Sequence, residues 1–180
     1  TKFKYVEMSL PLLSTGTIPP IIDSISTNIN IELDLSLKYE ELYQNYSTNL
    51  KRNLKKIDSE KLKFDQDVKL TEVVELFKNN KGLEYPDMGE TQYKTLIDLN
   101  LANHQQSWCV GVREIASSHL LAGALFITSP KSIVFLFSGV SETGRQQKAM
   151  FYLLDQVIKM NAEQGLILDF EGSNNIELAR

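Results

Sequence analysis

The stretch that decides the fold lies in the last third of the chain and reads SIVFLFSGVSETGRQQKAMFYLLDQVIKMNAEQGLILDF over residues 132–170. Its first part, Ser132 to Val140, has the composition of a strand. A helix is predicted to begin at Gly144 and to end at Gly165, because apolar residues recur between them at helical spacing. The predicted core face of this helix is Met150, Leu153, Leu154, Val157 and Ile158. A buried strand, Leu166 to Phe170, follows, and a crossover of this kind places its two strands parallel.

Further strands are predicted upstream of this crossover. Trp108 to Glu114 and Leu120 to Thr128 precede the Ser132 strand, and the tight connection at Pro130-Lys131 favours antiparallel pairing of the last two strands. Period-two alternation from Ile29 to Leu35 predicts a strand whose odd-numbered residues are buried. Two short strands are also predicted, from Phe3, Tyr5, Val6 and Met8 near the start and from Leu62, Phe64 and Val68.

Three more helices follow from apolar residues at helical spacing. The first is a single amphipathic helix from Leu37 to Ile57, whose outer face is basic. Thr71 is predicted to cap a helix with the stripe Val73, Val74, Leu76 and Phe77, and Thr91 to cap a helix that turns Tyr93, Leu96, Ile97, Leu99 and Leu101 toward the core. The element order indicates an α+β fold with a mixed, mostly antiparallel sheet flanked by helices.

Composition excludes several classes of protein. The chain has 180 residues, enough for one sizeable core, and a formal net charge of -4, which argues against nucleic acid or an anionic membrane as a general partner. No apolar run approaches the roughly 20 residues of a membrane-spanning helix, and residues 1–10 lack the pattern of a signal peptide. The lone Cys109 has no partner for an internal disulfide, so a reducing cytoplasm is the simplest compartment.

Motifs of other enzyme classes are missing from the sequence. His104 and His119 have no metal-ligand spacing to Cys109 or to carboxylates, so no metal site is expected. The sequence has neither a Gly-Lys-Ser/Thr phosphate loop nor a Gly-x-Ser-x-Gly elbow, which argues against nucleotide hydrolases and serine hydrolases.

Three segments together resemble a known group of proteins. Asp169-Phe170-Glu171-Gly172-Ser173-Asn174, with Ile176, Ala179 and Arg180 after it, resembles the end-of-domain signature of bacterial GNAT-type acetyltransferases and Fem-type aminoacyltransferases. The segments Tyr46 to Lys56 and Phe135 to Gly139, the latter running into the Gly144 helix, look like the same group. The resemblance implies a GNAT-like fold (that of acyl-CoA N-acyltransferases) over residues 37–180, with closing segments beyond residue 180. It also implies that residues 1–36 are the last strands of a preceding GNAT-like lobe.

The resemblance implies transfer of an acyl group to an amine on a small molecule or peptide. The donor is acetyl-CoA in acetyltransferases and aminoacyl-tRNA in Fem-type enzymes, and acetyl-CoA is the favoured donor here. The tRNA alternative rests on the basic face of Lys51, Arg52, Lys55 and Lys56, which could equally be solvated. A third hypothesis is a catalytically silent GNAT-like module for binding or assembly. A second GNAT-like lobe or a homodimer is a possible partner of the domain.

The loop Ser141 to Gln146 is the predicted phosphate site for coenzyme A. It joins a strand to the start of a helix, where free backbone N–H groups and the helix dipole favour an anion. The residues proposed to contact the cofactor are Ser141, Thr143, Gly144, Arg145 and Gln146. Acetyltransferases of this family have Gln or Arg at the position of Ser141 and a small residue at that of Gln146, so this loop departs from the pattern. The alternative is that Gly144 shapes a turn and Thr143 caps the helix.

Asp169 and Glu171 are the predicted catalytic residues, because strand alternation would place both on one side of the chain, where either could accept a proton. Alternatively, Asp169 accepts backbone hydrogen bonds at the end of the strand. Ser173 is a candidate for substrate binding or, with Asn174, for capping a closing helix. Ser138 and Tyr152 are weaker candidates for substrate binding.

Overall fold

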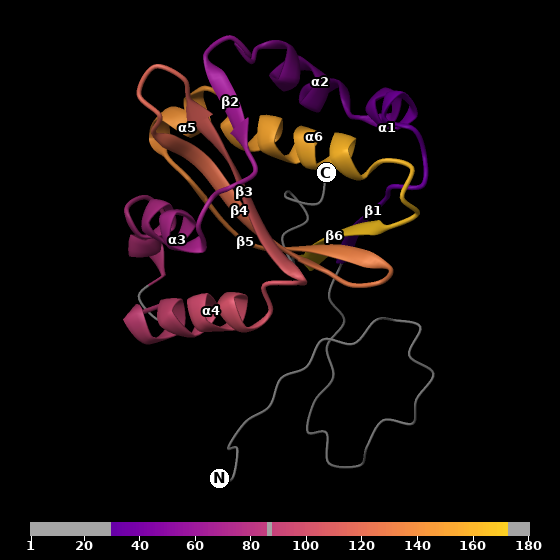
Figure 1. Ribbon diagram of the computed structural model, residues 1–180. Coiled ribbons are helices and arrows are strands. Elements are labelled where there is room, and N and C mark those ends of the chain that lie inside the picture. The colour runs from indigo at the N-terminus through magenta and orange to yellow at the C-terminus, as the bar shows by residue number, and fades with distance from the viewer. Residues whose placement is uncertain (1–29, 86–87, 173–180) are drawn as a thin grey trace.

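The computed structural model describes residues 30–85 and 88–172 as one mixed sheet with helices on both faces (Figure 1). The six strands lie in the order β1-β6-β5-β4-β3-β2. The strands are β1 Asn30–Asp34, β2 Leu62–Asp65, β3 Ser107–Glu114, β4 Leu120–Thr128, β5 Ser132–Val140 and β6 Ile167–Gly172. The helices are α1 Tyr39–Asn45, α2 Thr48–Lys55, α3 Leu70–Lys78, α4 Glu90–Ala102, α5 Glu142–Gln146 and α6 Ala149–Asn161, with a 3₁₀ turn, η1, at Gly82–Glu84. The strand predicted at residues 3–8, and Ser173, lie outside the described residues.

The pairing of the strands confirms the predicted topology. β3, β4 and β5 form a continuous antiparallel meander, and β2 and β1 add to it antiparallel at the two edges. β5 and β6 pair parallel through Ser132, Ile133 and Val134, as the crossover predicts. Among the described residues no helix is long and apolar enough to cross a membrane.

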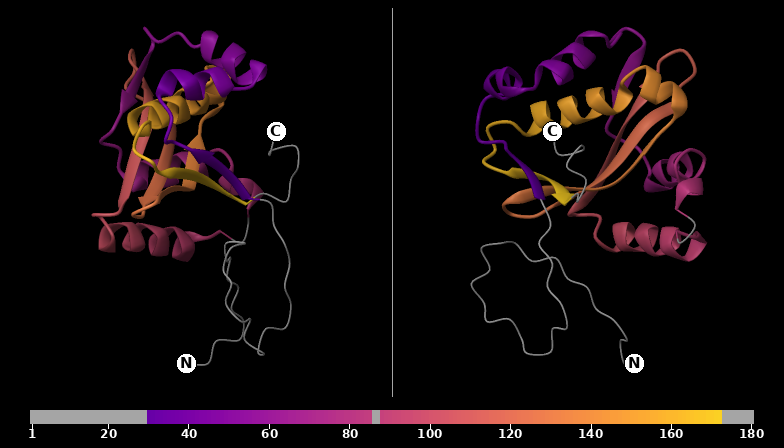
Figure 2. Two further views of the ribbon diagram at one scale, coloured as in Figure 1. Left: turned by 90° about the vertical axis from the view of Figure 1, so that its right-hand side faces the viewer. Right: turned by 180° about the vertical axis from the view of Figure 1, so that it is seen from behind.

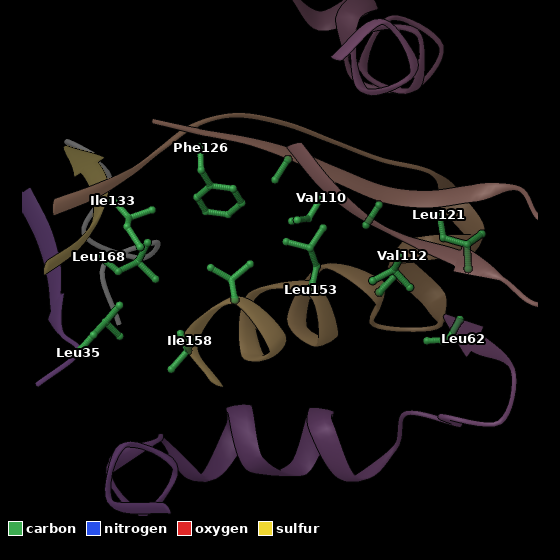
Figure 3. Close-up of a cluster of buried hydrophobic side chains, with 14 of the residues drawn as sticks. Leu35, Leu62, Val110, Val112, Leu121, Phe126, Ile133, Leu153, Ile158 and Leu168 are labelled. Atoms are coloured by element: carbon green, nitrogen blue, oxygen red, sulfur yellow. The ribbon is translucent and has the colours of Figure 1, made fainter. Parts of the chain in front are cut away.

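Helices cover the two faces of the sheet separately (Figure 2). α6 lies on one face, where Leu153, Val157 and Ile158 pack against buried side chains of the sheet (Figure 3). The paired helices α1 and α2 lie beyond α6 (Figure 3). α3 covers the other face, where Val73 and Phe77 pack in a second cluster with Leu125. Apolar burial on both faces is the main force that holds these layers together.

The single helix predicted over residues 37–57 is wrong. The chain forms α1 and α2 instead, separated by extended backbone at Tyr46 and Ser47. The Ser47 Oγ accepts a hydrogen bond from Leu50 N at 3.2 Å and so begins a new helix. Apolar spacing did not reveal this break, because the apolar residues of both helices face the same neighbour, α6.

A buried carboxylate fastens α1 to α6. The Tyr39 hydroxyl lies 2.9 Å from Asp155 Oδ1 and 3.1 Å from Oδ2. Burial raises the pKa of Asp155 above its ordinary value, although the hydrogen bond from Tyr39 acts in the opposite direction. Asp155 is the acidic residue of α6, and it is buried. The hydrogen bond from Tyr39 partly compensates for the free-energy cost of burying this carboxyl group.

The predicted starts of α3 and α4 are also wrong, each by two residues. α3 is preceded by Lys69, whose backbone N–H donates to Glu72 Oε1 at 3.2 Å, so Thr71 lies inside the helix. Gly89 precedes α4, and Thr91 is likewise helical. Tyr93 of α4 is buried as expected, but Leu99 and Leu101 are 56% and 66% exposed, against the prediction that they face the core.

Candidate functional site

The sheet forks at the end of the β5–β6 pairing. The two strands pair only over Ser132–Ile167, Ile133–Leu168 and Val134–Asp169. Beyond Val134, β5 continues for six residues, 135–140, without a strand partner on that side among the residues the structure describes. β6 and β1 diverge from the other strands in Figure 1. The second half of β5 therefore offers unpaired backbone groups that an extended ligand can bind.

Asp169 stands where the fork opens. It is the last residue of β6 that pairs with β5, opposite Val134, and on its other side it pairs with Glu32 of β1. Leu168 is buried against α6, so alternation turns Asp169 toward the opposite face of the sheet. Glu32 and Asp169 are thus cross-strand neighbours on one face, and like charges in that position destabilise a sheet. The fork carries two carboxylates.

A β-bulge follows Asp169. β6 has one residue more than β1 between the pairs Glu32–Asp169 and Asn30–Gly172, and Glu171 adopts the left-handed region with φ 61°. The bulge interrupts the alternation that we expected to place Asp169 and Glu171 on one side of the chain. Asp169 Oδ1 accepts a hydrogen bond from Glu171 N at 2.8 Å, the alternative role predicted for it. Whether either residue is a base stays a prediction.

The Ser141 to Gln146 loop is a short helix, α5, with a closed beginning. The Ser141 Oγ accepts from Gly144 N at 2.9 Å, so Ser141 caps the helix and not Thr143. Gly144 does not start the long helix. It is buried, and a Cβ at this position would lie 2.2 Å from the backbone oxygen of Leu121 on β4. The absence of a side chain is required for packing against the sheet, and a contact of Gly144 with a ligand stays a prediction.

The remaining polar side chains of the loop are exposed. Arg145 donates to Glu142 Oε2 through Nε at 3.0 Å and through Nη2 at 2.8 Å. This hydrogen bond holds the pKa of the Glu142 carboxyl below its ordinary value. Thr143 and Gln146 are exposed beside them. Of the predicted cofactor-binding residues, Arg145 brings a cation to the loop.

A second helix, α6, starts at Ala149, three residues after α5 ends at Gln146. Lys148 adopts the left-handed region, with φ 60° and ψ 30°, and α6 begins at Ala149 without a side-chain cap. A hollow of about 260 Å³ opens here, lined by Val140, Gly144, Arg145, Lys148, Met150 and Phe151. Lys148, the guanidinium of Arg145 that is shared with Glu142, and an uncapped helix start favour an anion at this point. We refer to it as the α6 hollow.

Another hollow lies beside the free half of β5. It measures about 280 Å³ and is lined by Phe77, Lys81, Tyr85, Met88 and β5 residues 135–138. The Lys81 ammonium sits 5.6 Å from the centre of the Tyr85 ring, and the Phe77 and Phe137 ring centres are 5.0 Å apart. Ser138, predicted to bind substrate, lies on this wall. We refer to it as the β5 hollow.

The structure brings some predicted site residues together and separates others. Ser138 and Arg145 line the two hollows along β5. Tyr152 is half-buried on α6 and packs against the core between α6 and the sheet. Sequence reasoning missed Glu32, because strand register is not readable from one strand, and Lys148, because the helix break at Gln147 has no proline or glycine to mark it.

Metal and thiol chemistry find no support in the described residues. Within 30–85 and 88–172 no cluster of three or more His, Cys, Asp or Glu could hold a metal ion. Cys109 is buried in the α3 layer, and burial raises the pKa of its thiol to about 11. A thiol of that pKa is a poor nucleophile at neutral pH.

Comparison with known proteins supports the fold. No protein-family model matches the chain, and no curated protein matches its sequence. The crystal structure of FemX is similar with a TM-score of 0.68 and 12% identity, over 81% of this chain and 53% of FemX. A conserved protein of unknown function from Bacteroides thetaiotaomicron VPI-5482 is similar with a TM-score of 0.57 and 11% identity, over 84% of this chain and 55% of that one.

The chain therefore spans about half the length of these two similar structures. At 11% and 12% identity the likeness shows the fold alone. The predicted fold class, an α+β fold with a mixed, mostly antiparallel sheet flanked by helices, is confirmed, and the chain shares its fold with the FemX crystal structure. The division of the chain at residue 36 stays a prediction.

Proposed function

We propose that this protein is an N-acyltransferase that moves an acetyl or other acyl group from acetyl-CoA to an amine. The observation that carries the proposal is the fork: residues 135–140 of β5, which have no strand partner on the β6 side among the described residues, run between a cation-lined hollow at one end and an aromatic hollow at their side. A long, thin donor with a charged end fits such a strand edge, and an amine acceptor fits the hollow beside it.

Coenzyme A would extend from the α6 hollow along residues 135–140 of β5, with its pyrophosphate in the hollow and its pantetheine arm beside the strand. Its pyrophosphate would lie at Arg145, Lys148 and the N-terminus of α6, where cations and free N–H groups gather. The two amides of its pantetheine arm would pair with the backbone of residues 135–140, as an added strand does. The thioester would then reach toward Val134, where the fork closes.

The chemistry needs few reactive side chains. The neutral amine attacks the thioester carbonyl, the carbon–sulfur bond breaks, and the thiolate leaves with the electron pair and takes up the proton that the attacking nitrogen loses as the amide forms. The incoming ammonium must first lose a proton, which Asp169 or Glu171 would accept, with Glu32 as the neighbouring carboxylate. Backbone N–H groups of β5 would stabilise the carbonyl oxygen as it gains charge. Placement of donor and acceptor supplies most of the remaining catalysis.

Calorimetric titration of acetyl-CoA tests the donor. The chain carrying both Arg145→Met and Lys148→Met should bind at least tenfold more weakly than wild type, since a charge-assisted contact contributes about 1.5–3 kcal/mol. Lys131→Met is the matched control, because Lys131 is an exposed lysine at the opposite end of β5. The absence of binding to wild type, or equal loss in the control, would overturn the coenzyme A site.

Transfer to an aminoacyl-tRNA donor is the second candidate, and the face of α2 favours it. Lys51, Arg52, Lys55 and Lys56 span an arc of about 140° at 100° per residue, opposite Leu50, Leu54 and Ile57. α2 has no acidic residue, and within the described residues none of these four cations is in an ion pair. An unpaired cationic face of this kind suits a phosphate backbone.

Salt dependence of tRNA binding separates the candidates. Replacing the four α2 cations with Gln should weaken tRNA binding and lower the slope of log K against log salt by about one for each phosphate that the protein no longer neutralises. Unchanged binding in this variant would rule out α2 as the tRNA surface. If neither donor binds, a silent binding module remains, and the exposed Leu99 and Leu101 of α4 are the first surface to test for a partner.

A further inference from the structure

Phe151 is an aromatic side chain displayed at the rim of the α6 hollow. It lies in the first turn of α6 and is 37% exposed. Its neighbours two residues away on each side, Ala149 and Leu153, are completely buried. At 100° per residue Phe151 is about 200° from each of them, so the helix itself turns the ring outward.

The α6 hollow combines cationic side chains with an aromatic ring. Lys148 and Arg145, the latter also hydrogen-bonded to Glu142, offer cations for phosphate, and the Phe151 ring offers a flat apolar face within the same lining. Single exposed aromatic residues on a surface need no explanation. A ring that shares a hollow with two cations matches a ligand that is both flat and anionic, and nucleotides have this composition.

We propose that Phe151 is the platform on which the adenine ring of a phosphate-bearing nucleotide stacks in the α6 hollow. Arg145 and Lys148 hold the phosphates, and Phe151 holds the base. The inference deepens the proposed function, because coenzyme A carries an adenosine 3′,5′-bisphosphate. Stacking would then distinguish coenzyme A from shorter acyl donors that lack the nucleotide.

Fluorescence of a Phe151→Trp variant reports stacking directly. The larger ring keeps the platform, and a stacked adenine should quench its emission. Adenosine 3′,5′-bisphosphate and acetyl-CoA are expected to quench this emission, and S-acetylpantetheine, which lacks the nucleotide, is not. Met160→Trp is the matched control, because Met160 is an exposed residue near the other end of α6. Equal quenching of the two variants would overturn the platform.

Affinity gives a second readout. Phe151→Ala should bind adenosine 3′,5′-bisphosphate about tenfold more weakly, within the range that stacking of a base on an aromatic ring contributes. Phe151→Leu should lose as much, since it keeps apolar area but not the flat ring. Affinity within twofold of wild type in both variants would contradict the inference, whatever the fluorescence shows.

The two proposals fail separately in these experiments. If acetyl-CoA binds wild type but Phe151→Ala binds it equally well, the donor site stands and the platform is wrong. If the bisphosphate quenches Phe151→Trp while acetyl-CoA does not bind, the platform stands and the proposed donor is wrong. If neither ligand binds wild type, both are wrong, and the exposed Phe151 ring is surface area only.

Discussion

Two helix starts lie seven residues apart at the same end of β5, and they are built in opposite ways. The start of α5 is closed: Ser141 caps it, and Gly144 brings its backbone against Leu121 of β4. The start of α6 is open: Lys148 is left-handed, no side chain caps the helix, and the α6 hollow faces it. Gly144, which the sequence offers as a ligand-binding residue, is thus required for packing against β4, and the open turn at Lys148 has no glycine.

The two helix starts separate close backbone packing, at Gly144, from the proposed binding of an anion, at Lys148. A glycine at a strand–helix junction permits close approach, but the approaching group here is a protein backbone. A lysine in the left-handed region is strained, and strain of this kind is retained where the surroundings require it. Substitutions of Ser141 and Gly144 at the first start should therefore change stability, and those of Lys148 at the second should change binding.

Gly144→Ala is expected to have the largest effect. Its Cβ would overlap the backbone oxygen of Leu121 at 2.2 Å, and neither backbone can yield without moving β4 or α5. Overpacking of this severity should lower the free energy of unfolding by about 3 kcal/mol, measured by urea denaturation. Gly89→Ala is the matched control, with ordinary contacts and an expected loss below about 1 kcal/mol.

A small loss of stability in Gly144→Ala, similar to that of Gly89→Ala, would contradict the conclusion that the start of α5 is closed. It would mean that the α5 turn can move away from β4, and that a ligand could occupy the space. A large loss has a practical consequence too: substitutions at Gly144 unfold the protein and are unsuitable for testing ligand binding.

Ser141→Ala tests the cap of the closed start. Removing an N-cap oxygen that accepts from Gly144 N at 2.9 Å should lower the free energy of unfolding by about 1 kcal/mol. Ser47→Ala at the start of α2 removes a similar cap with a longer bond, 3.2 Å, and gives the reference value. A stability change near zero in Ser141→Ala, together with altered acetyl-CoA affinity, would assign Ser141 to the ligand instead.

Most of the sheet could be predicted from the sequence, because strands and their order follow from local patterns. Ser132 to Val140 and Leu120 to Thr128 were located to the residue, and the parallel partner of β5 followed from the crossover rule. Helix breaks at Tyr46 and Gln147 did not follow, since both lack glycine and proline and both keep the apolar spacing. The Ser47 cap follows the first break, and left-handed backbone at Lys148 follows the second.

The candidate site was harder to predict than the fold. Register between β1 and β6 places Glu32 opposite Asp169, and register depends on the whole sheet. The bulge at Glu171 breaks an alternation that the sequence letters show as unbroken. Arg145 and Ser138 were candidates from the sequence and line the two hollows along β5, and their binding of a ligand stays a prediction. Lys148 and Phe151 were missed because the second helix start was unknown.

Arg145→Met should change the pKa of Glu142, at the start of α5, more than it changes the stability of the protein. The guanidinium hydrogen bond holds the pKa of Glu142 below its ordinary value, so its removal should raise that pKa toward normal. An NMR titration of the Glu142 carboxyl measures the rise directly. Because both side chains are exposed, the accompanying change in the free energy of unfolding should be too small to resolve by urea denaturation. Glu142 that titrates unchanged would show that the ion pair does not form in solution.

Lys148 allows charge and strain at the open start to be separated. Lys148→Met removes the charge but keeps the left-handed strain, so acetyl-CoA affinity should fall with no change in stability. Lys148→Asn removes the charge and also tolerates the left-handed region, so it should lose similar affinity and gain about 0.5 kcal/mol of stability. Glu163→Asn is the matched control, because Glu163 has φ 63° just beyond the other end of α6, away from the hollow. It should gain the same stability and bind as wild type. Equal stability of Lys148→Met and Lys148→Asn would show that the backbone at Lys148 carries no strain. Equal acetyl-CoA affinity of these two variants and Glu163→Asn would place the anion elsewhere.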